Sequence, residues 1–236
     1  MSFAKNIIGK GFIAKNLFKI KNKINKFKYI IYAAGISNSK IKSKNQLKRE
    51  IVTFNKFVEK NYLNKMIYIS TADITDNLKN KSKYVKNKIK IEKIIKQNFS
   101  NYIIIRIPQI IGKSKNKNTL INFFYDNIKK GKKITIFNNV KRNILDIDHV
   151  IKIIKVIMIN KKIHNQIITI SNKYFIKPIE IINILEKKLK KKANFHIKKT
   201  NKQKWSLNFK KNIKYFNKAN IVFNKNYCVK AINKYY

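Results

Sequence analysis

The feature that most constrains the fold of this chain is a regular alternation of short apolar, β-rich runs with longer amphipathic stretches studded with lysine. Strands that alternate with helices favour an α/β fold with a mostly parallel sheet, because each helix carries the chain back to the start of the next strand. The expected strands end near Ile8, Ala34, Ser70, Ile107, Phe137 and Ser171. The expected helices cover Phe12 to Lys21, Gln46 to Tyr62, Tyr84 to Gln97, Thr119 to Lys130, Asp146 to Asn160 and a last stretch from Pro178 towards Lys190.

The length of 236 residues suits one domain of ordinary size with a small appendage. The alternation weakens beyond about Lys191. We therefore expect a core over residues 1–160 and a small C-terminal lobe over residues 161–236, packed together as one compact unit.

A net charge of +46 would ordinarily suggest binding to nucleic acid. However, the chain holds 53 lysines, 34 asparagines and 47 isoleucines, whose codons are almost wholly A and T, so the charge is typical of a very AT-rich genome. The lysines are spread along the whole chain, and only three arginines are present, although arginine is the preferred residue for phosphate and base contacts. We therefore expect no specific nucleic-acid partner, and keep a nucleic-acid-binding protein as an alternative.

The remaining composition indicates a soluble, cytoplasmic protein. A single cysteine, Cys228, excludes an intramolecular disulfide and fits a reducing compartment. Lysines interrupt every apolar run well before the roughly 20 residues that a membrane span needs. The three histidines are too far apart in sequence to suggest a metal site, so we predict no metal.

An apolar strand at Ile7-Ile8 runs into Gly9-Lys10-Gly11-Phe12-Ile13-Ala14, a G-x-G-x-x-A pattern that opens a helix. Glycines in such a turn allow pyrophosphate to approach the backbone closely, and its charge then lies at the helix N-terminus. The chain has only five glycines, so this spacing is rarely met by chance. The pattern predicts a phosphate-binding loop.

Further segments follow the glycine loop in a fixed order. These are Ile31-Tyr32-Ala33-Ala34-Gly35, Tyr68-Ile69-Ser70-Thr71, the Y-x-x-x-K segment from Tyr84 to Lys88, Ile105-Arg106-Ile107-Pro108-Gln109-Ile110-Ile111-Gly112 and Arg142-Asn143-Ile144-Leu145-Asp146-Ile147-Asp148-His149-Val150. With this series the chain resembles the extended short-chain dehydrogenase/reductase superfamily, in the branch of NAD-dependent nucleotide-sugar epimerases and dehydratases. The resemblance runs, with gaps, from Lys5 to about Glu186 and implies a Rossmann-like sheet.

The resemblance also implies a cofactor, NAD or NADP, and a nucleotide-sugar substrate, and a homodimer is compatible with it. Tyr84 would be the general acid/base, Lys88 would lower its pKa, and Thr71 would orient the reacting sugar oxygen, with Ser70 in reserve. The implied substrate-side residues are Asp73, Gln109 and Arg142. The implied cofactor-binding residues are Gly9, Gly11, Phe12, Ile13, Ala14, Ala33, Ala34, Gly35, Lys88 and Pro108.

Taken alone, the Y-x-x-x-K spacing carries little information in so lysine-rich a chain. About two matches are expected by chance, and two occur, at Tyr84–Lys88 and Tyr125–Lys129. Tyr84 is preferred because it begins a helix soon after the Ser70-Thr71 strand. The inference therefore depends on the ordered series.

The sequence departs from the family pattern in three places. Gly11 and Gly35 are only 24 residues apart, where the family has two further strands, and no acidic residue precedes Glu50, so the carboxylate that binds the adenosine ribose is absent. The segment from Thr71 to Tyr84 is short for the family. After Thr71 the chain has Ala72-Asp73, so one carboxylate is available where dehydratases carry two, which favours an epimerase or reductase. A relative that binds a sugar nucleotide or a partner without redox turnover remains the main alternative.

Overall fold

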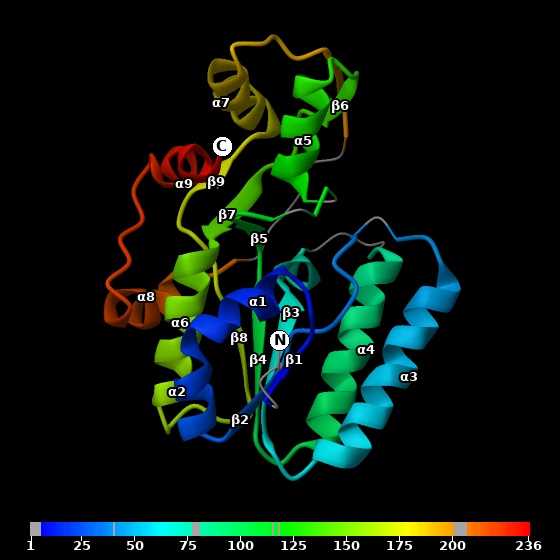
Figure 1. The fold of residues 1–236 in the computed structure, drawn as a ribbon, viewed down its shortest axis with the longest axis vertical. Helices are drawn as coiled ribbons and strands as arrows, with labels where there is room; N and C mark the ends of the chain where they lie inside the picture. Colours follow the sequence, from blue (N-terminus) through cyan, green and yellow to red (C-terminus); the bar gives the residue numbers. More distant parts are fainter. Residues whose placement is uncertain (1–5, 40, 77–80, 115, 118, 201–206) are drawn as a thin grey trace.

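The computed structural model describes residues 6–39, 41–76, 81–114, 116–117, 119–200 and 207–236. Its core is a parallel sheet of five strands in the order β1-β2-β3-β4-β8, and helices cover both faces (Figure 1). The predicted α/β fold with a mostly parallel sheet is therefore confirmed. The strands are β1 (Ile7–Ile8), β2 (Tyr29–Tyr32), β3 (Lys65–Thr71), β4 (Tyr102–Ile107) and β8 (Gln166–Thr169).

Alternating side chains of the central strands supply two separate apolar clusters, as the period of two in a strand requires. In β3, Ile67 and Ile69 belong to the cluster that includes the helices of one face, whereas Met66 and Tyr68 belong to the cluster of the other. The first face carries α1 (Phe12–Leu17), the 3-10 helix η1 (Phe18–Ile20), α2 (Lys21–Lys26) and α6 (Ile147–Ile159), and the second face carries α3 (Lys44–Asn61) and α4 (Lys83–Asn98).

This arrangement gives neighbouring crossovers opposite hands. The chain moves across the sheet in one direction from β1 to β4, yet the β1–β2 connection lies on the α6 face while the β2–β3 and β3–β4 connections lie on the other. Crossovers between parallel strands are almost always right-handed. The β1–β2 crossover therefore has the opposite hand to the two crossovers that follow it.

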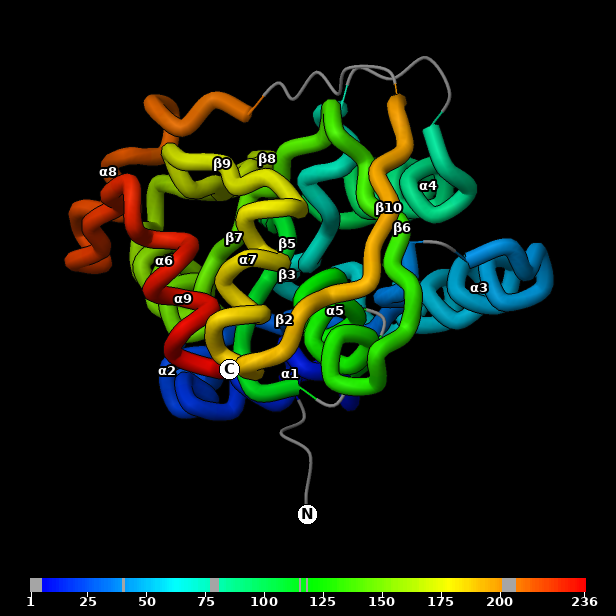
Figure 2. Tube along the Cα trace, turned by 90° about the horizontal axis from the view of Figure 1, so that it is seen from above, coloured from blue at the N-terminus to red at the C-terminus, as the bar shows by residue number. Residues whose placement is uncertain are grey.

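A second lobe lies above the carboxyl ends of the sheet strands (Figure 1). It contains the mixed strands β5 (Gln109–Ile111), β7 (Arg142–Asp146) and β9 (Phe175–Ile176) and the parallel pair β6 (Ile134–Phe137) and β10 (Phe195–Lys198), which run side by side in Figure 2. Its helices are α5 (Leu120–Lys129) and α7 (Pro178–Leu189). The predicted strand ending at Phe137 therefore belongs to this lobe. Strand β8 lies in the core sheet and α5 in the lobe, and the division of the chain at residue 160 stays a prediction.

A short 3-10 helix, η2 (Ala72–Thr75), follows β3. Near the C-terminus the chain forms η3 (Lys210–Asn212), α8 (Ile213–Lys218) and α9 (Tyr227–Tyr235). The other predicted helices occur within a few residues of their expected bounds, except that the first is broken after Leu17 by a 3-10 turn.

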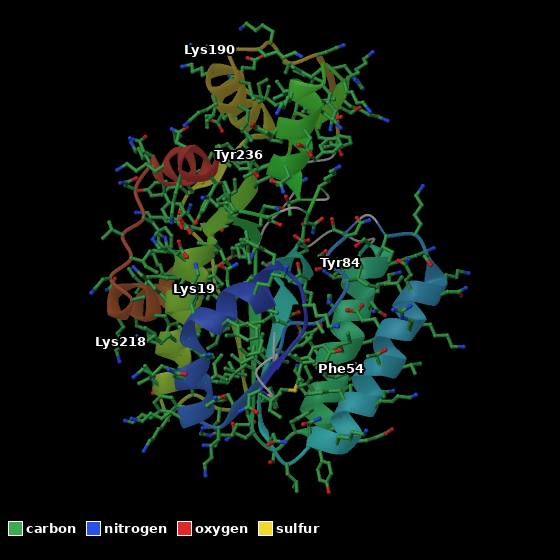
Figure 3. The ribbon with its side chains drawn as sticks, viewed as in Figure 1. Lys19, Phe54, Tyr84, Lys190, Lys218 and Tyr236 are labelled. Atoms are coloured by element: carbon green, nitrogen blue, oxygen red, sulfur yellow. The ribbon has the colours of Figure 1, made fainter. Side chains whose placement is uncertain are left out.

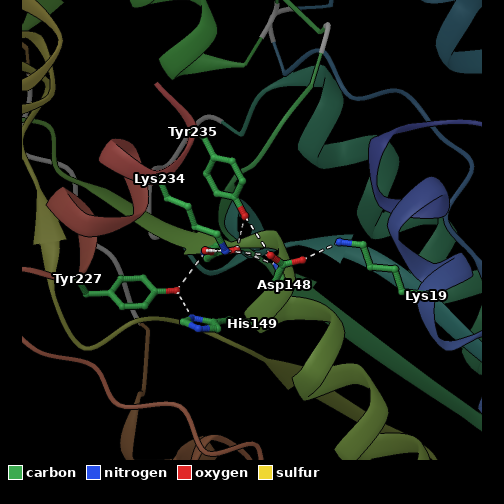
Figure 4. Close-up of polar contacts among 7 residues, drawn as sticks. Lys19, Asp148, His149, Tyr227, Lys234 and Tyr235 are labelled. Carbon is green, nitrogen blue, oxygen red and sulfur yellow. Dashed lines mark hydrogen bonds and ion pairs between the residues drawn. The ribbon is translucent and has the colours of Figure 1, made fainter. Parts of the chain in front are cut away.

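A network of charged and phenolic groups fixes α9 to the start of α6 (Figure 4). Lys234 Nζ lies 2.8 Å from Asp146 Oδ2 and 2.9 Å from Asp148 Oδ2, and the Tyr235 hydroxyl donates to Asp146 Oδ1 at 2.8 Å. The Tyr227 hydroxyl accepts from the Asp146 amide at 3.0 Å. Asp146 and Asp148, from the last sequence landmark, therefore hold the C-terminal helix in place.

Candidate active site

The predicted site residues meet at one edge of the molecule, where the sheet strands end beneath the second lobe. In a parallel sheet the carboxyl ends of all strands lie at the same edge, which is where α/β proteins bind ligands. Gly9 follows β1, Ala33 follows β2, Thr71 ends β3 and Pro108 follows β4. Figure 3 shows Tyr84 at the end of α4 that is nearest to the second lobe.

The first glycine is required by the geometry of the loop. Gly9 has a φ of +132°, and a Cβ atom there would lie 2.7 Å from the Ala33 carbonyl oxygen and 2.9 Å from the Ala34 amide nitrogen. Only glycine allows β1 and β2 to end so close together. Ala33 and Ala34 thus form one wall of the loop, as an ordinary consequence of the parallel pairing of β1 with β2.

The second glycine meets a different environment. Gly11 caps α1, and a Cβ atom there would meet nothing within 4 Å among the described residues. Gly11 therefore borders open space and does not serve close packing of strand against helix. Phe12 instead approaches Gly112, Ile13 is half-buried, and Ala14 is fully buried in the core.

The side chains of Thr71, at the end of β3, and Tyr84, at the start of α4, interact at this edge, since the Thr71 hydroxyl lowers the pKa of the Tyr84 phenol. Thr71 Oγ1 also accepts from the Asp73 amide at 3.2 Å, which turns the chain from β3 into η2. Arg142, at the start of β7 in the second lobe, faces Asp73 and attracts its carboxylate. Tyr84, Thr71, Asp73 and Arg142 therefore form one polar group between the two parts of the molecule. The predicted substrate-side residue Gln109 begins β5.

The acidity of Tyr84 runs opposite to the sequence expectation. Burial raises the pKa of Tyr84 well above its usual value, the charges of Asp73 and Glu50 raise it further, and only the hydrogen bond with Thr71 lowers it. The pKa of Asp73 is also raised by burial, against the lowering effect of Arg142. Without a further positive charge, Tyr84 is held as a neutral phenol.

Lys88, the lysine of Y-x-x-x-K, is engaged in a buried ion pair. Its Nζ lies 2.8 Å from Glu50 Oε1, and the two side chains are each only 5% exposed. The Lys88 Nζ is also 5.6 Å from the centre of the Tyr84 ring, one helical turn away. Gly35 lies directly against the pair, since a Cβ atom there would be 2.7 Å from both Glu50 Oε1 and Lys88 Nζ.

Ser70 has a separate set of partners. Successive residues of a strand point to opposite faces, so Ser70 points away from Thr71. The Ser70 hydroxyl donates to Glu92 Oε1 at 2.6 Å, and Glu92 also pairs with Arg106, whose Nε donates to the same oxygen at 3.0 Å. This arrangement gives Ser70 a role in joining β3, β4 and α4.

Sequence reasoning missed three members of these networks, namely Glu50, Asn87 and Glu92. Asn87 Nδ2 donates to Glu50 Oε2 at 2.7 Å, so both carboxylate oxygens of Glu50 are bonded. A signal was available: the chain has ten acidic residues against 56 basic ones, so an acid within a lysine-studded helix is informative. Buried carboxylates are retained where they are paired.

The residues fit one half of a nicotinamide dinucleotide better than the other. Gly11 borders open space among the described residues, so the backbone of the glycine loop is accessible to a phosphate group. On the adenosine side, β1 is the edge strand of the described sheet and only two residues long, so no strand beyond it carries a ribose-binding side chain. The described residues contain no cluster of His, Cys, Asp or Glu suited to a metal ion. In the same ranges, no helix has the length and apolar character needed to cross a membrane.

Three solved structures show what this fold is similar to. UDP-glucuronic acid 4-epimerase from Bacillus cereus, in complex with UDP-glucuronic acid and NAD, gives a TM-score of 0.69 at 19% identity, with 92% of this chain and 76% of that chain covered. MoeE5 with UDP-glucuronic acid and NAD gives 0.72 at 8% identity, covering 97% and 96%. The dTDP-glucose 4,6-dehydratase of Bacillus anthracis str. Ames, in complex with NAD, gives 0.65 at 17% identity, covering 95% and 77%.

In sequence, the chain matches no family model and no curated protein. The shared feature is the parallel sheet flanked by helices. The resemblance stated from the sequence is thereby confirmed at the level of the fold. The chain has the fold of the NAD-dependent nucleotide-sugar epimerases and dehydratases, the extended short-chain dehydrogenase/reductases.

Proposed function

We propose that this protein is an NAD(P)-dependent epimerase or reductase that acts on a nucleotide-activated sugar. The observation that carries the proposal is the neighbouring pair of Thr71 and Tyr84 at the carboxyl edge of the sheet, near the glycine loop and Arg142 of the second lobe. A phenol and a hydroxyl in this position can share one substrate oxygen. The substrate class is proposed from solved structures of similar fold, which are complexes with UDP-glucuronic acid and NAD.

In this proposal, Tyr84 exchanges a proton with a hydroxyl or keto oxygen of the sugar as general acid/base. Thr71 binds the same oxygen and orients it, and Arg142 and Gln109 lie on the substrate side. A bound nicotinamide would supply the hydride acceptor or donor. The chain's own task is to hold the sugar oxygen within reach of Tyr84 and to exclude water from it.

The carboxylates near Thr71 favour an epimerase or reductase over a dehydratase. Asp73 follows Thr71 by two residues, and its neighbour Ala72 has no acidic group. Asp73 also faces Arg142, whose charge lowers its pKa while burial raises it. A single carboxylate leaves no second acid beside it for the additional acid/base steps that elimination of water requires.

One specific observation favours a second candidate function, a protein that binds a sugar nucleotide without redox turnover. The sheet ends at β1, and Lys88 is already paired with Glu50 in a buried bridge. A chain that had lost the adenosine half of its cofactor site would keep the proposed substrate side, which includes Arg142. This candidate predicts binding of a nucleoside diphosphate and none of NAD or NADP.

Calorimetric titration with NAD, NADP and UDP, together with mass spectrometry of ligands that co-purify, separates the two. Binding of a dinucleotide, followed by interconversion of UDP-sugars or by reduction of the cofactor, supports the enzyme. Binding of UDP alone supports the second candidate. The Gly11→Val variant is the control, because its side chain enters the open space beside the loop without touching the core. Equal dinucleotide affinity in both proteins would contradict a cofactor site at this loop.

A further inference from the structure

The Glu50 carboxylate is hydrogen-bonded at both oxygens and is paired with Lys88, so the charge of Lys88 is largely neutralised. Glu50 Oε1 accepts from Lys88 Nζ at 2.8 Å and from the Ile36 amide at 3.1 Å, and its Oε2 accepts from Asn87 at 2.7 Å. Three elements therefore converge on one carboxylate: the loop after β2, helix α3 and helix α4. The pair is almost completely buried, so solvent does not screen it.

The position of the pair relative to the tyrosines gives it an electrostatic role. Lys88 Nζ is 5.6 Å from the centre of the Tyr84 ring and 5.8 Å from that of Tyr68. An isolated ammonium at this distance would favour tyrosinate by about two pKa units at an effective dielectric constant near 20. A carboxylate bonded directly to that ammonium turns the monopole into a short dipole, whose effect on Tyr84 is much smaller.

We propose that Glu50 is a positioning residue that fixes and neutralises Lys88, and so controls how readily the Tyr84 hydroxyl releases its proton. The importance for catalysis rests on the proposed function of Tyr84 as general acid/base, but the electrostatic relationship does not. In this arrangement the lysine keeps its place under Gly35 while the phenol remains protonated until another positive group enters the site.

The other charged and titratable groups around Tyr84 are consistent with this. Asp73 on η2 opposes ionisation, with Arg142 of β7 partly offsetting Asp73, and Tyr68 on β3 is neutral. The Tyr68 hydroxyl is fully buried and has no hydrogen-bond partner among the described residues. Tyr68 and Asp73 carry no positive charge, so neither can replace the Lys88 ammonium that Glu50 neutralises.

The test follows the titration of Tyr84 by NMR of tyrosine labelled at the ring carbon that bears the hydroxyl, with Tyr84→Phe to assign the signal. In the unmodified protein, Tyr84 should remain neutral beyond about pH 10, the ordinary pKa of tyrosine. In Glu50→Gln, the Tyr84 titration should move down by about one unit or more, because Lys88 is no longer cancelled. Glu59→Gln, an exposed acid on the same helix, is the matched control and should leave it unchanged.

A second variant covers the case in which Glu50→Gln does not fold. The double variant Glu50→Gln/Lys88→Met removes both charges, and its Tyr84 should titrate like that of the unmodified protein. Tyr84 ionising below about pH 10 in the unmodified protein would overturn the proposal. The same titration in Glu50→Gln and the unmodified protein would do so too. None of these measurements needs turnover, so absence of enzymatic activity would refute the proposed function alone.

Discussion

Lys19 and Asp148 are 129 residues apart in the sequence, yet Lys19 Nζ donates to Asp148 Oδ1 at 2.7 Å. The other carboxylate oxygen of Asp148 pairs with Lys234 of α9 at 2.9 Å. One side chain thus connects the first helical segment, the start of α6 and the C-terminal helix. Asp148 follows β7, the strand that begins at Arg142. Its two lysine partners, Lys19 and Lys234, come from opposite ends of the chain.

The Asp148→Asn substitution should loosen α9 and remove an acid-sensitive contribution to stability. The hydrogen bonds from Lys19 and Lys234 hold the pKa of Asp148 below its usual value of 3.8, so the stabilisation is complete above about pH 4 and is lost as the pH falls below it. Since the group is more than a third exposed, screening limits the loss to about 1 kcal/mol or less. Hydrogen exchange of the α9 amides as a function of pH measures it. Unchanged acid sensitivity in the variant would assign the effect to another carboxylate.

Tyr84→Phe should lose most turnover while ligand binding remains. Removal of a positioned acid/base typically lowers the rate by 10²–10⁴-fold. Tyr125→Phe is the matched control, since Tyr125 shares the Y-x-x-x-K spacing but lies on α5, where its ring packs against Tyr236 with centres 5.1 Å apart. Steady-state kinetics of the three proteins decide the matter, and similar rates for Tyr84→Phe and the unmodified protein would remove Tyr84 from the mechanism.

The two loop glycines should respond differently to alanine. Gly9→Ala places a Cβ atom against the backbone of Ala33 at a φ of +132°, so it should lower the free energy of unfolding by roughly 1–3 kcal/mol or more. Gly11→Ala, which meets open space, should leave stability within about 0.5 kcal/mol. Thermal unfolding of both variants is the measurement. Equal destabilisation would show that the end of β2 does not restrict Gly9 as described.

Nucleic-acid binding, where it occurs, should be unspecific. Fifty-three lysines and three arginines offer many phosphate contacts and few side chains able to read bases, and Arg106 is already paired with Glu92. Affinity should fall steeply with salt and differ little between unrelated sequences of one length. Competition binding near physiological salt tests this, and a site preferred by about a thousand-fold or more would revive the nucleic-acid alternative.

The sequence predicted the core well because its strands and helices have strong, distinct periodicities. The runs that end at Ile8 and Ile107 are strands with those same ends, and Phe12 begins a helix as expected. It predicted the lobe less well. The strand ending at Phe137 has an alternating buried and exposed pattern like any other, and nothing local shows that it pairs with residues 195–198 instead of the main sheet.

The order of the site residues along the chain could be predicted from the sequence, but the contacts that their side chains make could not. The spacing from Thr71 to Tyr84 places both near one edge, and the two side chains do interact. The partner of Lys88 was not predictable, because Glu50 lies on a different helix and reaches Lys88 only once both helices pack on the same face of the sheet. The direction in which the pKa of Tyr84 moves was wrong, because burial and the charges of Asp73 and Glu50 raise it.

The sequential strand order has a consequence for how the protein is made. Strands β1 to β4 lie side by side in the order in which they leave the ribosome, so four of the five strands of the sheet are complete by Ile107. Their contacts are local in sequence, which favours rapid folding. The excursion through β5, α5, β6 and β7 then separates β4 from β8, which closes the sheet only after residue 166. During synthesis, strands β1 to β4 should therefore acquire structure first, and the carboxyl edge that holds Thr71 and Tyr84 should form before the lobe that covers it.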